Sequence, residues 1–354
     1  MNPAHLIVVA ILLTPSLSCS PSLPAAVTPA RGHYGAVVDG HFTGQDGDRV
    51  AGEATYHTVS RALDSAPESS PTPFVILIRK GRYHEKLTVD KANITLLGES
   101  RDGTVLTFDA HADTPQPDGG SYGTSGSFTL RVAAPDFHAQ QLTIENAFDF
   151  RANSAKSAAD PTRSNNTQAV ALLLDHGSDR ATFTNCVISG WQATLFANAG
   201  RAWFHDCIIL GQTDFIVGAG IAYFDDCDIV SRGAGNIAAP STPPLQLYGF
   251  VFHGCRLGRE TDRVKPNTVA LGRPWHPSSN PNVSPSAVFI DCNMDDHILV
   301  EGWAPLGAYG PETARFFEYR DHGVGAVSHR ARRTLNDAEL ARYAIREVLG
   351  GWTP

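Results

Sequence analysis

The sequence predicts an all-β fold, a single-stranded parallel β-helix, and two observations support this prediction. The first is a recurring frame, Phe-x-x-Cys-x-apolar, which begins at Phe183, Phe204, Phe224, Phe252 and Phe289. The second is its period, because the cysteines of successive frames are 21, 20, 28 and 37 residues apart. Such periods indicate a solenoid, and about twenty residues is too short for a repeat of two helices. The frame is expected to alternate inward and outward residues, as a short strand does.

Cysteine placement predicts one ladder inside the stack, because coils of a β-helix lie about 4.8 Å apart and bring equivalent residues together. Cys207 and Cys227 are the best pair for a disulfide, if the local geometry allows one. Cys186, Cys255 and Cys292 are expected to be small buried thiols. The chain has no Cys-x-x-Cys, and its 14 histidines form no His-x-x-x-His pair, so no metal site is expected.

Further strands are expected upstream of the frames, at residues 74–79, 94–97, 104–108 and 128–132. Helix-spaced apolar residues over 56–66 predict a short helix that caps the N-terminal end of the stack. A second helix is expected over 337–349, packed on the outside of the coils through Leu340, Ala344 and Val348. Asn336 can cap it, and Gly350-Gly351 ends it. Segments 238–244 and 274–281 are expected to leave the stack as long loops.

Composition limits the class of protein. The 354 residues are 42% hydrophobic and 18% charged, with a net charge of −8, so a nucleic acid partner is not expected. Residues 1–18 are expected to be a signal peptide, because the apolar run at 6–13 is too short to span a membrane. The mature protein is then expected to be secreted or periplasmic. Alternatively, because the signal peptide ends in a lipobox-like sequence, Cys19 would carry a lipid that anchors the protein to a membrane. Residues 19–50 are expected to be a linker, and 51–354 the β-helix.

Polar residues at coil-related spacings form a candidate site. Asp214 follows Ala193 by 21 residues, and Ala193 follows Gln168 by 25, so one-coil spacings place these positions on one ladder. A carboxylate beside uncharged amides, here those of Gln168 and Gln192, can attack a carbonyl and hold the resulting oxyanion. A purely structural ladder of Asn, Gln and Asp is the alternative on spacing alone.

Several ordered motifs resemble those of the pectin methylesterase family. They are Gly-Arg-Tyr-His-Glu at 81–85, Gln-Ala-Val-Ala-Leu at 168–172, Gly-Trp-Gln-Ala-Thr-Leu at 190–195, Thr-Asp-Phe-Ile-Val-Gly at 213–218 and Leu-Gly-Arg-Pro-Trp at 271–275. The resemblance covers roughly residues 55–326, and several ordered motifs are far more specific than one. It implies a right-handed parallel β-helix and a hydrolase that removes methyl groups from methyl-esterified galacturonan.

The resemblance also implies roles for individual residues. Asp214 matches the nucleophile, Gln192 the oxyanion donor and Gln168 the second amide. Arg273 matches the arginine that keeps the nucleophile ionised, since a bidentate guanidinium favours the charged carboxylate. Trp275 matches the aromatic residue that lines the sugar cleft, although a loop tryptophan can also simply cover a coil edge. Pectin is the expected partner of a monomer that needs no cofactor.

One departure from the family motif bears directly on activity. Where the family has Gln-Asp-Thr-Leu, this chain has Gln-Ala-Thr-Leu at 192–195, so Ala193 replaces the general acid and base. Loss of such a group costs about 10²–10⁴-fold in rate. A milder departure is Val217, where the family usually has a second aromatic residue.

Three explanations of Ala193 remain open. Water or another acid takes over, although Asp228, Glu145 and Asp175 cannot be placed from the sequence. Alternatively, the ester has a better leaving group, such as an aryl alcohol or a thiol. In the third, the chain is a non-catalytic relative that binds galacturonan.

Gly-Gly-Ser-Tyr-Gly at 119–123 fits the nucleophile elbow of serine hydrolases. That elbow needs a preceding strand and a following helix. Because no helical pattern follows, we expect a loop here.

Overall fold

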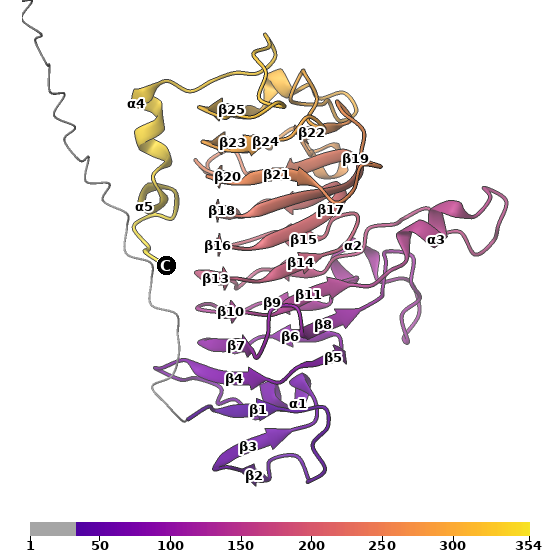
Figure 1. Cartoon of the computed structure of the whole chain (residues 1–354), viewed down its shortest axis with the longest axis vertical. Coiled ribbons are helices and arrows are strands. Elements are labelled where there is room, and N and C mark those ends of the chain that lie inside the picture. The colour runs from indigo at the N-terminus through magenta and orange to yellow at the C-terminus, as the bar shows by residue number, and fades with distance from the viewer. Residues whose placement is uncertain (1–32) are drawn as a thin grey trace, which may run out of the picture. The chain divides into compact units, whose positions relative to one another are not determined.

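The computed structural model describes residues 33–354, which form a parallel β-helix (Figure 1). The expected signal peptide over 1–18 and Cys19 lie outside the described residues. No helix within 33–354 is long and apolar enough to cross a membrane. The β-helix begins at β1 (Ala36–Val38), which pairs in parallel with β4 (Phe74–Ile78). The described part of the segment 19–50, expected as a linker, therefore already contributes a strand to the stack.

Two large sheets run along the stack. The first sheet has 12 strands. In addition to β1 and β4 it contains β2 (Arg49–Val50), β3 (Glu53–Tyr56), β7 (Ile94–Gly98), β10 (His138–Gln140), β13 (Ala181–Thr184), β16 (Arg201–His205), β18 (Ile221–Asp225), β20 (Phe250–His253), β23 (Ser286–Ile290) and β25 (Arg315–Tyr319). All neighbours in it pair in parallel except β2 and β3.

The second sheet has 13 strands. They are β5 (Gly81–His84), β6 (Leu87–Val89), β8 (Thr104–Phe108), β9 (Leu130–Val132), β11 (Thr143–Asn146), β12 (Leu172–Leu174), β14 (Val187–Ser189), β15 (Leu195–Ala197), β17 (Ile208–Gly218), β19 (Asp228–Pro240), β21 (Arg256–Arg259), β22 (Val269–Gly272) and β24 (Asn293–Met294). The strands expected from the sequence at 74–79, 94–97, 104–108 and 128–132 are confirmed as β4, β7, β8 and β9.

The Phe-x-x-Cys-x-apolar frame is a corner between two strands rather than a single strand. Phe183 lies in β13 and Ile188 in β14, while Asn185 between them has a left-handed backbone with φ of 50°. This residue turns the chain, so that Phe183, Cys186 and Ile188 all point inward and are fully buried. A single strand would place the first and fourth positions on opposite faces. The left-handed position recurs in the other frames, at Asp206, Asp226, Gly254 and Asp291.

Aromatic rings and thiols fill the inside of these corners. From Phe183 to Phe289 the frame phenylalanines stack at centroid separations of 4.7, 4.9, 4.6 and 4.3 Å. The cysteines beside them are buried and free, so the pairing of Cys207 with Cys227 is not formed. The Cys207 Sγ donates to the Phe183 carbonyl at 3.3 Å, and the Cys227 Sγ donates in the same way to the Phe204 carbonyl of the preceding coil, at 3.4 Å. Burial raises the pKa of both thiols, which keeps them protonated donors.

The N-terminal end of the stack carries the expected helix, α1 (Val59–Asp64). Val59, Ala62 and Leu63 are its buried face, which packs against β1, β3 and β6. The carboxylate of Glu85 accepts hydrogen bonds from two backbone amides of its first turn, those of Val59 and Ser60, both at 2.9 Å. Glu85 therefore stabilises the positive end of the helix, which is a structural role.

The C-terminal segment packs on the outside of the first sheet, as expected, but it is not one helix. It forms α4 (Asp337–Leu340), a 3₁₀ turn (Ala341–Tyr343) and α5 (Ile345–Val348). Asn336 caps α4, but Ala344 is extended, with ψ of 140°, and exposed. This break lets the larger apolar residues pack on the sheet, where Val348 and Leu349 are buried and Tyr343 contacts Tyr248.

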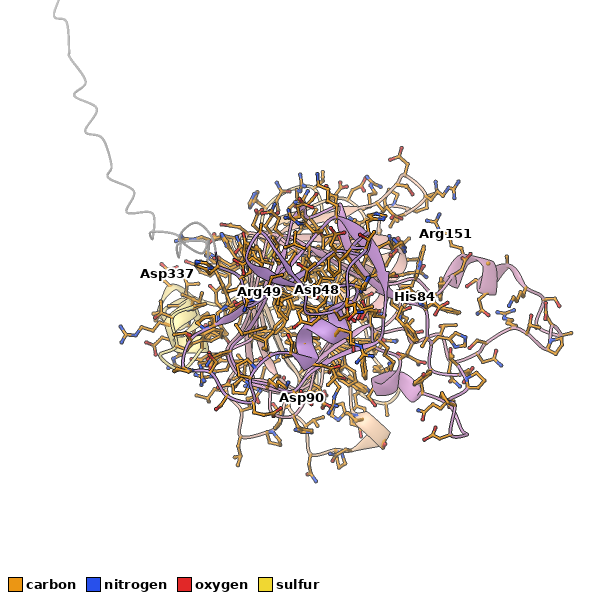
Figure 2. All side chains as sticks on the ribbon, turned by 90° about the horizontal axis from the view of Figure 1, so that it is seen from below. Asp48, Arg49, His84, Asp90, Arg151 and Asp337 are labelled. Atoms are coloured by element: carbon orange, nitrogen blue, oxygen red, sulfur yellow. The ribbon has the colours of Figure 1, made fainter. Side chains whose placement is uncertain are left out.

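Two arms leave the stack beside the second sheet; the first includes the loop expected at 119–123, and the second was not expected from the sequence. One contains α2 (Gly123–Gly126), and the other contains α3 (Phe150–Ala155) and projects farthest from the coils (Figure 1). Viewed from the N-terminal end, Arg151 on this arm and Asp337 of α4 lie on opposite sides of the molecule (Figure 2). The serine-elbow sequence lies in the first arm. A four-residue helix does follow it, contrary to expectation. The strand that a nucleophile elbow needs before the serine is not formed, because Ser121 makes only an isolated antiparallel bridge with Pro115.

The loops expected at 238–244 and 274–281 differ from each other. Residues 238–240 belong to β19, and the chain stays buried through Thr242. The first segment therefore becomes exposed only from Pro243 onward. The second follows β22 and contains a short 3₁₀ turn (Pro277–Ser279).

Candidate active site

The site forms where the long strand β17 bends. Thr213 pairs with Asn236 of β19, but the register shifts on both sides of this pair, between Gly211 and Thr213 and between Thr213 and Ile216. Asp214 occupies the bend with a left-handed backbone, φ of 47°. Gly235 allows the next coil to approach, since a Cβ there would lie 2.3 Å from the Gln212 carbonyl oxygen. The irregularity turns the Asp214 side chain out of the regular ladder.

The expected ladder is present with a shift of one residue. Gln168 pairs with Gln192, and Gln192 pairs with Thr213, each in a parallel bridge. Asp214 and Ala193 are the residues that directly follow this row, so Asp214 does not align with Gln168 as expected. The two amides are thus on adjacent coils, and the carboxylate lies one position farther along the next coil.

Arg273 holds the carboxylate of Asp214 in a bidentate ion pair. Its Nε donates to Oδ1 at 2.7 Å, and its Nη2 donates to Oδ2. Both side chains are largely buried, with 23% of Arg273 and 14% of Asp214 exposed. Arg273 directly follows β22, and its backbone amide donates to the Ala238 carbonyl at 2.9 Å, which fixes where the side chain starts. Both carboxylate oxygens of Asp214 are thus paired with the guanidinium in the two-pronged geometry that arginine and carboxylate groups favour.

Thr167 is a site residue that the sequence analysis did not find. Its Oγ1 donates a hydrogen bond to Gln192 Oε1 at 2.7 Å, across one coil. With the oxygen of the amide engaged, the Nε2 of Gln192 is left to donate to a bound substrate. The only signal in the sequence is that Thr167 precedes Gln168, and the pairing of the two coils is needed to interpret it.

Gln168 is held through its backbone and has an unsatisfied side-chain oxygen. The Ala112 amide donates to its carbonyl at 2.8 Å, and Ala169 donates to the Gln192 carbonyl at 3.0 Å. Its Oε1 is buried without a hydrogen-bond partner among residues 33–354. This oxygen is therefore one of the buried polar atoms in residues 33–354 that have no protein partner.

An apolar patch lies beside these polar groups. It comprises Val170, Leu173, Ala193, Phe196, Val217 and Ala239, with Phe128 and Trp275 packed against it. Trp275 meets Phe196 edge to face, at a centroid separation of 5.9 Å. The patch brings Trp275, Ala193 and Val217 together, and its members have no titratable side chain. The position of the missing acid is therefore an apolar surface in this protein.

The backbone at position 193 remains suited to an aspartate. Ala193 has φ of 56° and is 4% exposed. Asp and Asn enter this left-handed region several times more readily than other residues with a Cβ. Alanine has no side-chain hydrogen bond to offset this conformation, so the fold keeps the geometry without the carboxylate.

None of the three acids considered as substitutes lies in the site. Asp228 pairs with Arg256 at 2.7 Å, and Asp175 pairs with Arg131 at 2.8 Å. Glu145 pairs with Arg82. Each is committed to an arginine outside the row of Gln168, Gln192 and Asp214.

Comparisons with known proteins identify the family to which the chain is similar. The family model described as Pectinesterase matches residues 49–351. The chain is 41% identical to pectinesterase A of Dickeya chrysanthemi over 326 residues, which is 85% of this chain and 88% of that protein. The structure of pectin methylesterase PemA from Erwinia chrysanthemi is similar with a TM-score of 0.85 and 42% identity, covering 91% of this chain and 99% of that one.

A further solved structure is that of a pectin methylesterase mutant, with one aspartate replaced by alanine, in complex with hexasaccharide IV. It matches with a TM-score of 0.84 and 42% identity, over 91% of this chain and 99% of that one. The identities exceed 40% over most of both chains, and the matched region spans both the coils and the site. This chain therefore belongs to the pectinesterase family.

Proposed function

We propose that this chain hydrolyses the methyl esters of galacturonan, with Asp214 as the nucleophile. The observation that carries the proposal is the bidentate pair of Asp214 and Arg273 beside Gln168 and Gln192. An ionised carboxylate next to amide donors suits attack on an ester carbonyl. Membership of the family and the hexasaccharide bound by a related pectin methylesterase support pectin as the substrate.

The reaction proceeds in two steps. An oxygen of Asp214 attacks the C6 carbonyl carbon, and the negative oxygen that develops accepts hydrogen bonds from the amides of Gln192 and Gln168. The bond to the methoxy group breaks, which leaves an anhydride between the sugar and Asp214. Water then hydrolyses this anhydride, and the carboxylates of the product and of Asp214 are formed. The steps use side chains and water alone.

Ala193 makes the first step slow. The departing methoxide needs a proton, and Ala193 and its apolar neighbours have no acidic group to donate one. With water as the proton donor, the expected penalty is about 10²–10⁴-fold relative to a site with a general acid.

Substrate binding rests on local contacts. Trp275 and Phe196 offer apolar surface beside Asp214, on which a sugar ring can pack. The net charge of −8 repels a free polyanion, whereas methyl esterification removes charge from the polymer. We therefore expect highly methylated pectin to bind better than polygalacturonate.

The site of action follows from the substrate, a polymer outside the cytoplasm. We propose a monomer that is exported through a signal peptide over residues 1–18. Lipid anchoring at Cys19 is the alternative form of export, and mass spectrometry of the mature protein distinguishes the two.

The test is methanol release from highly methylated pectin by the purified protein. We expect slow release, which Asp214→Asn abolishes and which Ala193→Asp increases. Thermal unfolding of each variant verifies that it is folded. An inert parent that binds pectin and becomes active as Ala193→Asp would identify the natural chain as a galacturonan-binding protein. Equal activity of the parent and folded Asp214→Asn would overturn the assignment of the nucleophile.

A further inference from the structure

A second polar cluster lies away from the proposed active site, on the outer face of the first sheet. Consecutive strands β16, β18 and β20 place His205, Asp225 and His253 at the same position, one on each coil. Asp226, the next residue after Asp225, occupies the left-handed corner. Three neighbouring coils thus present two imidazoles and two carboxylates side by side.

The distances in this cluster suit groups that share one ligand. His253 Nδ1 lies 2.9 Å from Asp225 Oδ1, and His205 Nδ1 lies 3.3 Å from Asp225 Oδ2. One ligand atom each of His205, Asp225 and Asp226 lies within 4.8 Å of the other two. Each histidine therefore faces a different oxygen of the central carboxylate.

Two observations indicate more than an ordinary ion pair. The His205 side chain is 13% exposed, and its Nδ1 is buried without an aligned hydrogen bond, despite the nearby carboxylate. In addition, the corner position of the next coil is Gly254, where a Cβ would lie 2.5 Å from Asp226 Oδ1. The equivalent corners at Asp206 and Asp291 carry side chains. Glycine at this corner therefore lets the Asp226 carboxylate lie directly against the backbone of the next coil.

The surrounding charge is negative. The charged groups that act on the two histidines are Asp225, Asp226, Asp206 and Asp291, all of them acidic. Asp226 is exposed and 42% of the His253 side chain is accessible, so an ion from solvent can reach the cluster. A cation would offset this concentration of carboxylates.

We propose that His205, Asp225 and Asp226, with His253 beside them, bind a divalent transition-metal ion of the zinc, cobalt or manganese class. Imidazole nitrogen together with carboxylate oxygen favours these ions over calcium or magnesium, which prefer oxygen ligands alone. The three ligands come from the neighbouring coils of β16 and β18, so the ion ties these two coils together on the first sheet, and it takes no part in ester hydrolysis at the second sheet. The proposal stands independently of the proposed function.

Binding requires at most a small movement of side chains. Ligands about 2.1 Å from one ion lie at most about 4.2 Å apart, and the ligand atoms of His205, Asp225 and Asp226 already lie within 4.8 Å of one another. Asp226 is exposed, so its carboxylate can turn toward the histidines without disturbing the core.

The test is titration of the purified, tag-free chain with Zn²⁺ by calorimetry, after treatment with a chelator. Interaction with the Asp225 carboxylate raises the pKa of His205 and of His253, so the titration is run at a pH of about 8 and of about 9, above the ordinary pKa of imidazole. We expect one site, and a raised Tm when it is filled. Asp226→Asn keeps the shape and the corner conformation, and should weaken binding about tenfold or more. His205→Ala should abolish the site. Co²⁺, followed by its visible absorption, reports whether nitrogen and oxygen ligands surround the ion.

His84→Ala is the matched control, because His84 also lies near a carboxylate, that of Asp109 at 3.4 Å, but outside this cluster. It should bind Zn²⁺ like the parent. Asp226→Asn also covers the case in which His205→Ala fails to fold. Absence of binding by the folded parent, or unchanged affinity in folded Asp226→Asn and His205→Ala, would overturn the proposal.

Discussion

The outer faces of the two sheets differ in regularity. On the first sheet, the strands from β13 to β23 pair in unbroken register, and each coil repeats the same inward phenylalanine. On the second sheet, the register shifts at the bend of β17, and both Asp214 and Ala193 have left-handed backbones. The regular face is covered by apolar residues of the C-terminal segment, whereas the irregular face carries the row of polar groups.

This difference separates stability from chemistry. Identical residues on successive coils bury one another, so the regular side contributes packing energy at every repeat. A shift in register interrupts that repetition and aims side chains out of the ladder, which is a common way to place reactive groups. Variants of the stack should therefore change the free energy of unfolding, and variants of the bend should change the rate. The following predictions test this separation.

The largest effect is expected from restoring the missing acid. Ala193→Asp should raise the rate of methanol release by about 10²–10⁴-fold, because the departing methoxide then receives a proton from a neighbouring carboxyl group. The left-handed backbone at this position accepts Asp more readily than Ala, but a carboxylate buried in the apolar patch costs stability, so we expect Tm to fall by a few degrees. The rate constant and Tm of both proteins are the measurements. No gain in a folded variant would mean that another feature of the site limits the reaction.

On the regular side, Phe224→Ala should reduce the free energy of unfolding by about 3–5 kcal/mol. Phe224 is fully buried, and its ring stacks on Phe204 at 4.9 Å and on Phe252 at 4.6 Å. Urea unfolding followed by circular dichroism measures the change, and Phe224→Leu should lose less. If the folded Phe224→Ala variant also lost activity at low temperature, the two sides would be coupled and the separation would be wrong.

A pH effect is expected from His297, which is fully buried near β22. Burial lowers its pKa from 6.5 to about 4, so the folded chain holds it neutral while the unfolded chain binds a proton below about 6.5. The contribution of His297 to the free energy of unfolding is therefore fully present above pH 6.5. It decreases by roughly 3 kcal/mol as the pH falls toward 4. Urea unfolding at several pH values should show this loss, and His297→Leu should remove that part of it. An identical pH dependence in His297→Leu would contradict the assignment.

The smallest effect is expected from Thr167, which positions Gln192. Thr167→Val keeps the shape but frees the amide to rotate, and should lower kcat about tenfold with KM nearly unchanged, because the interaction lost is that with the oxyanion. Thr167→Ser retains the hydroxyl and should restore kcat. If Thr167→Ser were as slow as Thr167→Val, packing of the methyl group rather than the hydrogen bond would be responsible.

Much of the stack could be predicted because its signals are local. The frames around Cys186 and Cys207 repeat within about twenty residues, and the position of α1 follows from apolar spacing within one segment. Errors arose where longer-range packing decides. Ala344 breaks the predicted C-terminal helix because larger neighbours gain contacts with the first sheet, and Cys207 turns its thiol to a carbonyl rather than to Cys227.

The site shows the same limit. Motif resemblance brought Asp214, Gln192, Gln168, Arg273 and Trp275 into consideration, and the structure brings all of them to one face. Their chemical roles remain predictions for the variants above to test. Thr167 was missed because its contact crosses one coil to a residue 25 positions later.

The sequence alone determined the period of the solenoid and the absence of an acid at position 193, since each is a property of residue type and spacing. The inward direction of all three frame residues depends on the left-handed corner, which the structure revealed. Only the tertiary structure decided the register of the coils. Register sets which of two neighbouring residues faces a partner, and it is fixed by packing along the whole stack. It places Arg273 against Asp214 across 59 positions of chain, and it gathers His205, Asp225 and His253 on the opposite sheet.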